Sequence, residues 1–160
     1  IGLLATPGTV KRSYTKRSIQ EFAHDCQTVC VGSSALVELA ERKLRQRPVD
    51  SQELLAILAP LLTASKTNPT PDRLDTLVLA CTHFPLLAAE IQQVLGEHIR
   101  LIDSGSAIAR RIEYWTERIE PIGLDPELPT YAWFTKTAPE IAELSAALPA
   151  FGFSESRILR

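Results

Sequence analysis

Short apolar runs alternate with longer segments of helical period along most of the chain. The apolar runs predict buried strands, and they lie at 1–5, 26–31, 77–80, 99–102 and 131–134. The periodic segments between and after them predict helices at 10–24, 35–45, 52–64, 85–95, 107–119 and 139–148. This alternation is typical of repeated βα units, and it predicts an α/β fold with a mostly parallel sheet flanked by helices.

Glycine, proline and serine mark the breaks between these elements. Pro60 falls inside the segment 52–64, where it is expected to kink or interrupt the helix. The segments 66–72 and 120–129 are rich in proline and are interpreted as loops. Gly32 is followed by two serines that can cap the next helix.

Four short turns follow predicted strands, at 6–9, 32–34, 81–83 and 103–105, and all of them are small and polar. In an open α/β sheet the turns at the carboxyl ends of the strands gather on one edge, where ligands bind. Hydroxyl groups and backbone N–H groups at helix starts can hold an anion. The turns therefore predict a site for a small carboxylate or phosphate ligand.

Composition narrows the class of protein but does not name it. Hydrophobic residues make up 45% of the 160 residues and charged residues 22%, which is ordinary for a soluble globular protein. A net charge of -2 gives no reason to expect nucleic acid or an acidic membrane surface as a partner. No apolar run reaches the roughly 18 residues of a membrane span.

Three cysteines, Cys26, Cys30 and Cys81, are too few and too odd in number for a disulfide framework. A reducing, cytoplasmic location is the simplest interpretation. Cys26 and Cys30 are expected to be core or half-core residues of a strand, and no further ligand-like spacing indicates a metal. The chain also lacks methionine and opens on an apolar run, so we expect an N-terminal portion to be missing.

Cys81 stands where a predicted strand ends and a helical pattern begins, with His83 two residues further on. A helix N-terminus favours a thiolate, and an imidazole can share or relay its proton. The local sequence therefore predicts a reactive cysteine. The alternatives are a thiol that acts as a small buried hydrophobe and a histidine that only caps the helix.

Residues 80–87, Ala-Cys-Thr-His-Phe-Pro-Leu-Leu, resemble the second catalytic-cysteine motif of glutamate racemases. Residues 1–15, 36–38, 101–105 and 109–111 resemble further segments of that family in the same order. The resemblance covers nearly the whole chain and is nearest to the enterobacterial type.

The resemblance implies two similar α/β lobes with mostly parallel sheets flanked by helices, in which residues 1–84 form the second lobe. Residues 85–160 would return to complete the first lobe, whose N-terminal part is missing. It also implies cofactor-independent interconversion of L- and D-glutamate by two cysteines, supplying D-glutamate for peptidoglycan. The chain lacks the motif of the first catalytic cysteine, so we expect it to be inactive alone.

The resemblance implies catalytic roles for Cys81, His83 and Glu38, with Glu38 near the imidazole. It implies substrate contacts at Thr82 and His83, and at the hydroxyl groups of Thr6 and Thr9. The plainer alternatives are a solvated Glu38 and threonines that only satisfy backbone groups in a tight turn. No metal and no cofactor are expected.

Glutamate is the expected substrate, and a UDP-linked muramyl-alanine precursor is an expected activator of the enterobacterial type. No nucleic-acid or membrane partner is expected, and a homodimer is left open. Two alternatives remain. One is an aspartate racemase or related superfamily member, and the other is a non-catalytic protein that binds an acidic metabolite.

Overall fold

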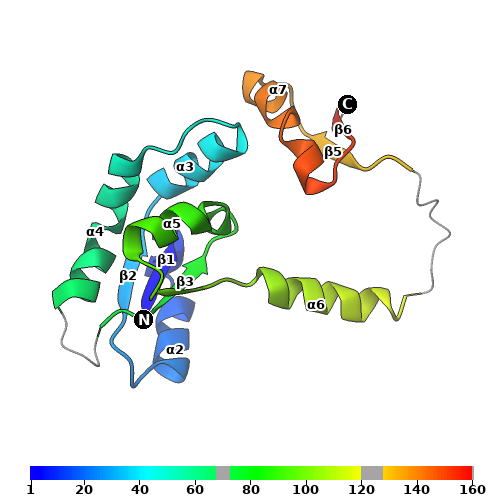
Figure 1. The fold of residues 1–160 in the computed structure, drawn as a ribbon. Coiled ribbons are helices and arrows are strands. Elements are labelled where there is room, and N and C mark those ends of the chain that lie inside the picture. Colours follow the sequence, from blue (N-terminus) through cyan, green and yellow to red (C-terminus); the bar gives the residue numbers. More distant parts are fainter. Residues whose placement is uncertain (68–72, 120–127, 160) are drawn as a thin grey trace.

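The computed structural model describes residues 1–67, 73–119 and 128–159 (Figure 1). Its main sheet has four parallel strands in the order β2-β1-β3-β4. Their bounds are β1 Gly2–Ala5, β2 Val29–Gly32, β3 Thr76–Ala80 and β4 Arg100–Ile102. In the middle of the sheet, Leu4 of β1 pairs with Val31 of β2 and with Leu79 of β3. The predicted α/β fold with a parallel sheet is confirmed.

The helices follow the strands in the predicted order (Figure 1). Those that accompany the main sheet are α1 Pro7–Lys11, α2 Ser13–Phe22, α3 Ala35–Leu44, α4 Ser51–Thr67, the 3-10 helix η1 Phe84–Leu87, and α5 Ala88–Leu95. The later ones are α6 Gly105–Thr116, α7 Pro139–Ser145 and the 3-10 helix η2 Leu148–Phe151.

One hydrophobic core joins the main sheet to α3, α4, α5 and η1. Its members are fully or almost fully buried leucines and isoleucines with one alanine and one phenylalanine, among them Leu4, Leu36, Leu58, Leu79, Phe84 and Ile91. Each buried side chain of this size contributes about 1.5–3 kcal/mol to folding. The core therefore fixes α3 and η1 relative to the end of β3, which is where Cys81 lies.

Three local predictions differ from the structure. The predicted turn at 6–9 contains the start of α1, because Thr6 caps this helix and Pro7 suits its first position. The predicted helix 10–24 is divided at Arg12, whose backbone is extended. The interruption expected at Pro60 does not occur, since α4 continues through it. Of the predicted loops, residues 68–72 and 120–127 lie outside the described residues.

The prediction that Cys26 and Cys30 are core or half-core residues is wrong, because both thiols are exposed. β2 is an edge strand, and its residues alternate between partly buried and exposed. Val29 and Val31 pack against the core, so Cys30 between them faces the other way. The strand is therefore covered on the face of its valines, and Cys30 lies on the other face.

The C-terminal segment, residues 128–159, forms a small βαβ unit. β5 Tyr131–Phe134 pairs in parallel with β6 Glu155–Ile158, and α7 and η2 connect them. This unit lies beside the end of α3, whereas α6 projects from the main sheet and has no buried residue (Figure 1). After residue 84, β4 pairs with β3 in the main sheet, and α5 packs against the same core. The division of the complete protein into two lobes at residue 84 stays a prediction.

Candidate active site

The carboxyl ends of three neighbouring strands meet at one edge of the main sheet, as they must in a parallel sheet. β1 leads to Thr6, β3 to Cys81 and β4 to Asp103. A cavity of about 440 Å³ opens there. It is lined by Thr9, Tyr14, Val78, Leu79, Ala80, Cys81, Thr82, Ile102, Asp103 and Ser104. Of the four turns predicted to gather, those at 6–9, 81–83 and 103–105 line this cavity, and the turn at 32–34 does not.

The thiol of Cys81 and the imidazole of His83 lie side by side. Sγ of Cys81 is 3.9 Å from Nδ1 of His83, and both side chains are half-buried. The backbone turns sharply here, with the N–H of Phe84 donating to the carbonyl of Cys81 over 3.2 Å. Because Phe84 is fully buried, this turn is anchored in the core. A half-buried thiol beside an imidazole has the groups needed to move a proton.

The helix that follows Cys81 differs from the prediction. A four-residue 3-10 helix, η1, comes first, and the α-helix α5 begins only at Ala88. The dipole effect falls off within the first turn of a helix, so α5 lies too far along the chain to favour a thiolate at Cys81. His83, whose Nδ1 is 3.9 Å from the thiol, is thus better placed than α5 to assist proton loss from Cys81.

Thr6 and Thr9 form one hydroxyl pair, with their Oγ1 atoms 3.0 Å apart. Oγ1 of Thr6 also accepts from the N–H of Thr9, and Oγ1 of Thr15 donates to the carbonyl of Thr9 over 2.6 Å. Thr9 lines the cavity, whereas Thr6 holds Thr9 and caps α1. Of the four predicted substrate contacts, Thr9 and Thr82 face the cavity, and Thr6 and His83 stand directly behind lining residues.

The carboxylate that contacts His83 in the structure is that of Glu41, and the predicted role of Glu38 near the imidazole stays a prediction. Oε1 of Glu41 is 2.9 Å from Nε2 of His83. Glu38 is exposed one turn earlier on α3. The sequence placed a glutamate of α3 near the imidazole but could not give the register of α3 against η1, which depends on how the core packs.

Tyr14, Asp103 and Ser104 are lining residues that were not singled out as individual site residues. Asp103 accepts a 2.6 Å hydrogen bond from the N–H of Gly105, which shapes the turn after β4. The polar turn predicted at 103–105 is the sequence feature that indicated Asp103 and Ser104. Nothing in the sequence marks Tyr14, since it lies on a mostly polar helix and its side chain is 60% exposed.

The remaining cysteines stand apart from this cavity. Desolvation raises the thiol pKa of Cys30, and desolvation together with the charge of Asp25 raises that of Cys26. Both thiols are therefore protonated at neutral pH and poorly nucleophilic. Within the described ranges, no cluster of His, Cys, Asp and Glu could hold a metal ion. No helix in those ranges is long and apolar enough to cross a membrane.

A parallel α/β sheet with a thiol–imidazole pair at its carboxyl edge defines a class: α/β proteins equipped for proton transfer by cysteine. No protein-family model matches the chain. The glutamate racemase of Vibrio vulnificus (strain YJ016) is 44% identical over 154 residues, 96% of this chain and 54% of the relative. That of Shewanella piezotolerans is 56% identical over 112 residues, 70% of this chain and 39% of the relative.

Solved structures of glutamate racemases are also similar to this chain. Escherichia coli glutamate racemase, in complex with L-glutamate and the activator UDP-MurNAc-Ala, matches with a TM-score of 0.86 at 43% identity. The match covers 99% of this chain and 57% of that one. The isoform RacE1 from Bacillus anthracis, at 23% identity and a TM-score of 0.67, supports the fold alone.

The chain is therefore a homologue of the glutamate racemases, a family of amino-acid racemases, and it has their fold. The resemblance seen in residues 80–87 is confirmed. The chain spans about half the length of the curated relatives it matches.

Proposed function

We propose that this chain carries one half of the catalytic machinery of a glutamate racemase, with Cys81 as its acid–base residue. The observation that carries the proposal is the position of Cys81 Sγ, which lines the cavity 3.9 Å from the imidazole of His83. The identity of 44% with a glutamate racemase over 96% of the chain supports glutamate as the substrate.

Cys81 acts as the base on L-glutamate in this proposal. Its thiolate takes the α-proton, and the electron pair left on Cα delocalises into the adjacent carboxylate. A second thiol on the opposite face of the substrate, supplied by the rest of the complete protein, returns a proton and gives D-glutamate. In the reverse direction Cys81 is the thiol that donates. No oxidant, metal or cofactor is needed to balance these steps.

A free thiol titrates near 8.5, so only a few per cent is thiolate at neutral pH. His83 assists by accepting the proton of Cys81 before catalysis and returning it afterwards. The α-proton of an amino acid is very weakly acidic, and donors fixed around the substrate carboxylate stabilise the developing charge. Thr9 and Thr82 supply such donors, and Thr6 holds the hydroxyl of Thr9 in position.

Asp103 supplies the negative charge among the described lining residues. A carboxylate in this place attracts the ammonium group of an amino acid and repels a second carboxylate. The substrate therefore orients with its ammonium group toward Asp103 and its α-carboxylate toward the threonines. A role of Glu38 in the complete site stays a prediction, with its side chain acting once the rest of the protein covers α3.

The proposal extends to the whole protein in four respects. The E. coli structure contains UDP-MurNAc-Ala as activator, which supports a UDP-linked muramyl-alanine activator here. The enzyme would act in the cytoplasm, and the D-glutamate that it forms would be used for peptidoglycan synthesis. The complete protein would have two lobes, with residues 1–84 in the second and later residues returning to the first. A homodimer is compatible with this arrangement.

The test is α-proton exchange of L- and D-glutamate in deuterated water, with aspartate as a parallel substrate. It uses the full product of the open reading frame that encodes this chain, alone and with the UDP-linked activator. The matched control is Cys30→Ala, which removes an exposed thiol of the same sheet outside the cavity.

Exchange and inversion of glutamate that are lost in Cys81→Ala and kept in Cys30→Ala would establish the proposal. Exchange on aspartate alone would assign the chain to an aspartate racemase. No exchange on either substrate, combined with glutamate binding that Cys81→Ala leaves intact, would point to a non-catalytic binding protein.

A further inference from the structure

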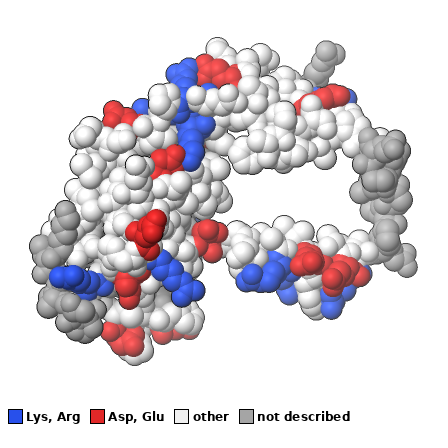
Figure 2. Space-filling model, in the orientation of Figure 1, with Lys and Arg blue, Asp and Glu red and all other residues white. Residues whose placement is uncertain are grey.

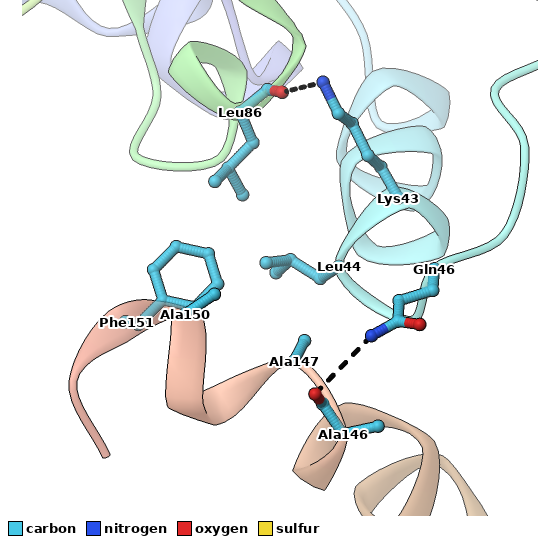
Figure 3. Close-up of a pocket in the computed structure, with 8 residues that line it drawn as sticks. All are labelled: Lys43, Leu44, Gln46, Leu86, Ala146, Ala147, Ala150 and Phe151. Atoms are coloured by element: carbon cyan, nitrogen blue, oxygen red, sulfur yellow. Dashed lines mark hydrogen bonds between the residues drawn. The ribbon is translucent and has the colours of Figure 1, made fainter.

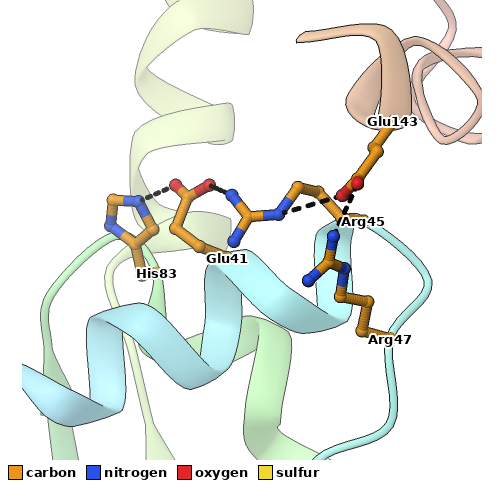
Figure 4. Close-up of polar contacts among 5 residues, drawn as sticks. All are labelled: Glu41, Arg45, Arg47, His83 and Glu143. Atoms are coloured by element: carbon orange, nitrogen blue, oxygen red, sulfur yellow. Dashed lines mark hydrogen bonds and ion pairs between the residues drawn. The ribbon is translucent and has the colours of Figure 1, made fainter. Parts of the chain in front are cut away.

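A line of charged side chains runs from His83 along α3 to the C-terminal segment (Figure 4). It starts with Glu41, whose Oε1 lies 2.9 Å from Nε2 of His83. A carboxylate only accepts hydrogen bonds, so Nε2 is the donor. In the neutral imidazole this leaves the lone pair on Nδ1, the nitrogen that faces Sγ of Cys81. Glu41 thus sets which nitrogen of His83 is available to the thiol.

Arg45 stands on the other side of Glu41, one helical turn along α3. Its Nη1 is 3.6 Å from Oε2 of Glu41, so the two oxygens of Glu41 serve His83 and Arg45 separately. The same guanidinium reaches Glu143 of α7, with Nε 3.6 Å from Oε2. Arg45 therefore joins the carboxylate that faces the imidazole to a carboxylate of the C-terminal segment.

The atoms that face each other between Arg45 and Glu143 are shielded from water. Nε of Arg45 and Oε2 of Glu143 are both buried and have no hydrogen-bond partner in the described residues. Buried polar groups without a hydrogen-bond partner are rare in native proteins, because leaving such a group unsatisfied costs free energy of folding. The pair is held by charge attraction across 3.6 Å, so each group depends on the other to remain in place.

The backbone at the end of α3 is shaped to present these arginines. Gln46 has a positive φ of 59°, and the N–H of Arg47 donates to the carbonyl of Arg42 over 3.0 Å, which ends the helix in a Schellman motif. Nη2 of Arg47 then lies 2.5 Å from Oε1 of Glu143. Glu143 is thus held by two arginines, one on each side of the left-handed residue. Figure 2 shows basic and acidic side chains gathered where α3 meets the C-terminal segment.

Apolar packing is loose beside this charged contact. A cavity of about 240 Å³ lies between α3, η1 and the C-terminal segment (Figure 3). Leu44, Leu86, Ala147 and Phe151 line it from the two sides. Because the hydrophobic contact is incomplete, the position of α7 against α3 depends strongly on Glu143 and its arginines.

We propose that Glu41 is a positioning residue for His83, and that Arg45 and Glu143 hold Glu41 so that the C-terminal segment fixes the imidazole facing Cys81. The inference rests on the function proposed above for the importance of Cys81, but its geometry concerns this chain alone. Loss of Glu41 leaves the imidazole free to rotate away from the thiol. Loss of Glu143 loosens Arg45 and has the same effect in weaker form.

The test measures how fast iodoacetamide alkylates Cys81 in the 160-residue chain, with Cys26 and Cys30 replaced by serine so that one thiol reacts. In this background Glu41→Leu removes the acceptor, and Glu41→Gln keeps a neutral acceptor of the same shape. The matched control is Glu53→Gln. It removes the charge of Glu53 on α4 and so breaks the 2.6 Å ion pair with Arg42, which lies on α3 next to Glu41. Melting temperatures identify variants that fail to fold, and Glu41→Ala replaces Glu41→Leu in that case.

Glu41→Leu is expected to slow alkylation about tenfold, because a displaced base loses the proton-transfer assistance that a positioned one gives. Glu41→Gln should restore most of the rate, Glu143→Gln should slow it less than Glu41→Leu, and Glu53→Gln should leave it unchanged. The proton on Nε2 of His83, followed by 15N NMR, should be protected from exchange in the parent and in Glu41→Gln and unprotected in Glu41→Leu.

Equal rates in Glu41→Leu and the parent, or equal slowing in Glu41→Leu and Glu53→Gln, would overturn the positioning role of Glu41. An unchanged rate in Glu143→Gln would overturn the part assigned to the C-terminal segment. Neither readout requires racemisation. Absence of α-proton exchange in the full gene product would therefore count against the proposed function and leave this result standing.

Discussion

Gly32, the last residue of β2, gives the most direct test of how the site is supported. A Cβ placed on Gly32 would lie 3.0 Å from Cα of Pro7, and 3.4 Å from both N of Pro7 and Cγ2 of Val10. Two of these three atoms belong to the backbone at the start of α1, the helix that carries Thr9 to the cavity. Gly32→Ala therefore pushes α1 away from the sheet by a few tenths of an ångström.

The size of the effect follows from this geometry. The backbone of Pro7 cannot move as a side-chain tip can, and overpacking of this kind costs about 1–3 kcal/mol. For a chain of this length, 1 kcal/mol shifts the melting temperature by roughly 2–4 °C. Gly32→Ala is therefore expected to lower it by about 2–12 °C.

Gly8 provides the matched control, because a Cβ on Gly8 meets no heavy atom within 4 Å. Gly8 lies inside α1, where alanine is favoured over glycine by about 0.5–1 kcal/mol. Gly8→Ala should raise the melting temperature, measured by circular dichroism at 222 nm under identical conditions. A Gly32→Ala chain that melts at or above the parent would refute the close approach of β2 and α1.

Three further predictions follow from single positions. Phe84→Ala, at a fully buried core residue, should lower the free energy of unfolding by about 3–5 kcal/mol in urea titration, whereas a loss below 1 kcal/mol would contradict its burial. Gln46→Gly should stabilise the chain by about 0.5–1 kcal/mol, because glycine adopts the positive φ without strain; destabilisation would show that the side chain matters more than the backbone. Desolvation raises the thiol pKa of Cys30 in the folded state, so its contribution to stability is complete below about pH 8.5 and is lost as the pH rises through the folded value. Unfolding curves between pH 7 and 10 should show this loss in the parent and less of it in Cys30→Ser, and identical pH dependence would refute it.

Much of the fold could be predicted because apolar runs and segments of helical period occupy separate stretches of the chain. The apolar run before Cys81 became β3, and the apolar spacing of Leu36, Leu39 and Ala40 became the buried face of α3. β6 was missed because Glu-Ser-Arg-Ile is not an apolar run and all its residues are exposed. A strand held mainly by its backbone ladder leaves little trace in the side-chain pattern.

The site was predicted where neighbours in sequence are neighbours in space. Cys81, Thr82 and His83 share one turn, so their proximity needs no knowledge of the rest of the fold. Glu41 and His83 come from different elements, and only the packed core decides which glutamate of α3 meets the imidazole. The exposure of Cys30 likewise depends on β2 being an edge strand, which the strand order decides.

The central place of β1 also affects how the chain folds. Gly2 pairs with Val29 on one side and with Leu77 on the other, so the second pairing must close a long stretch of sequence. Contacts of such wide separation slow folding, because the loss of chain entropy precedes the gain in contacts. During synthesis, at about 5–20 residues per second, β1 leaves the ribosome several seconds before its partner β3. An apolar strand with one side unpaired for that long is a natural substrate for chaperones.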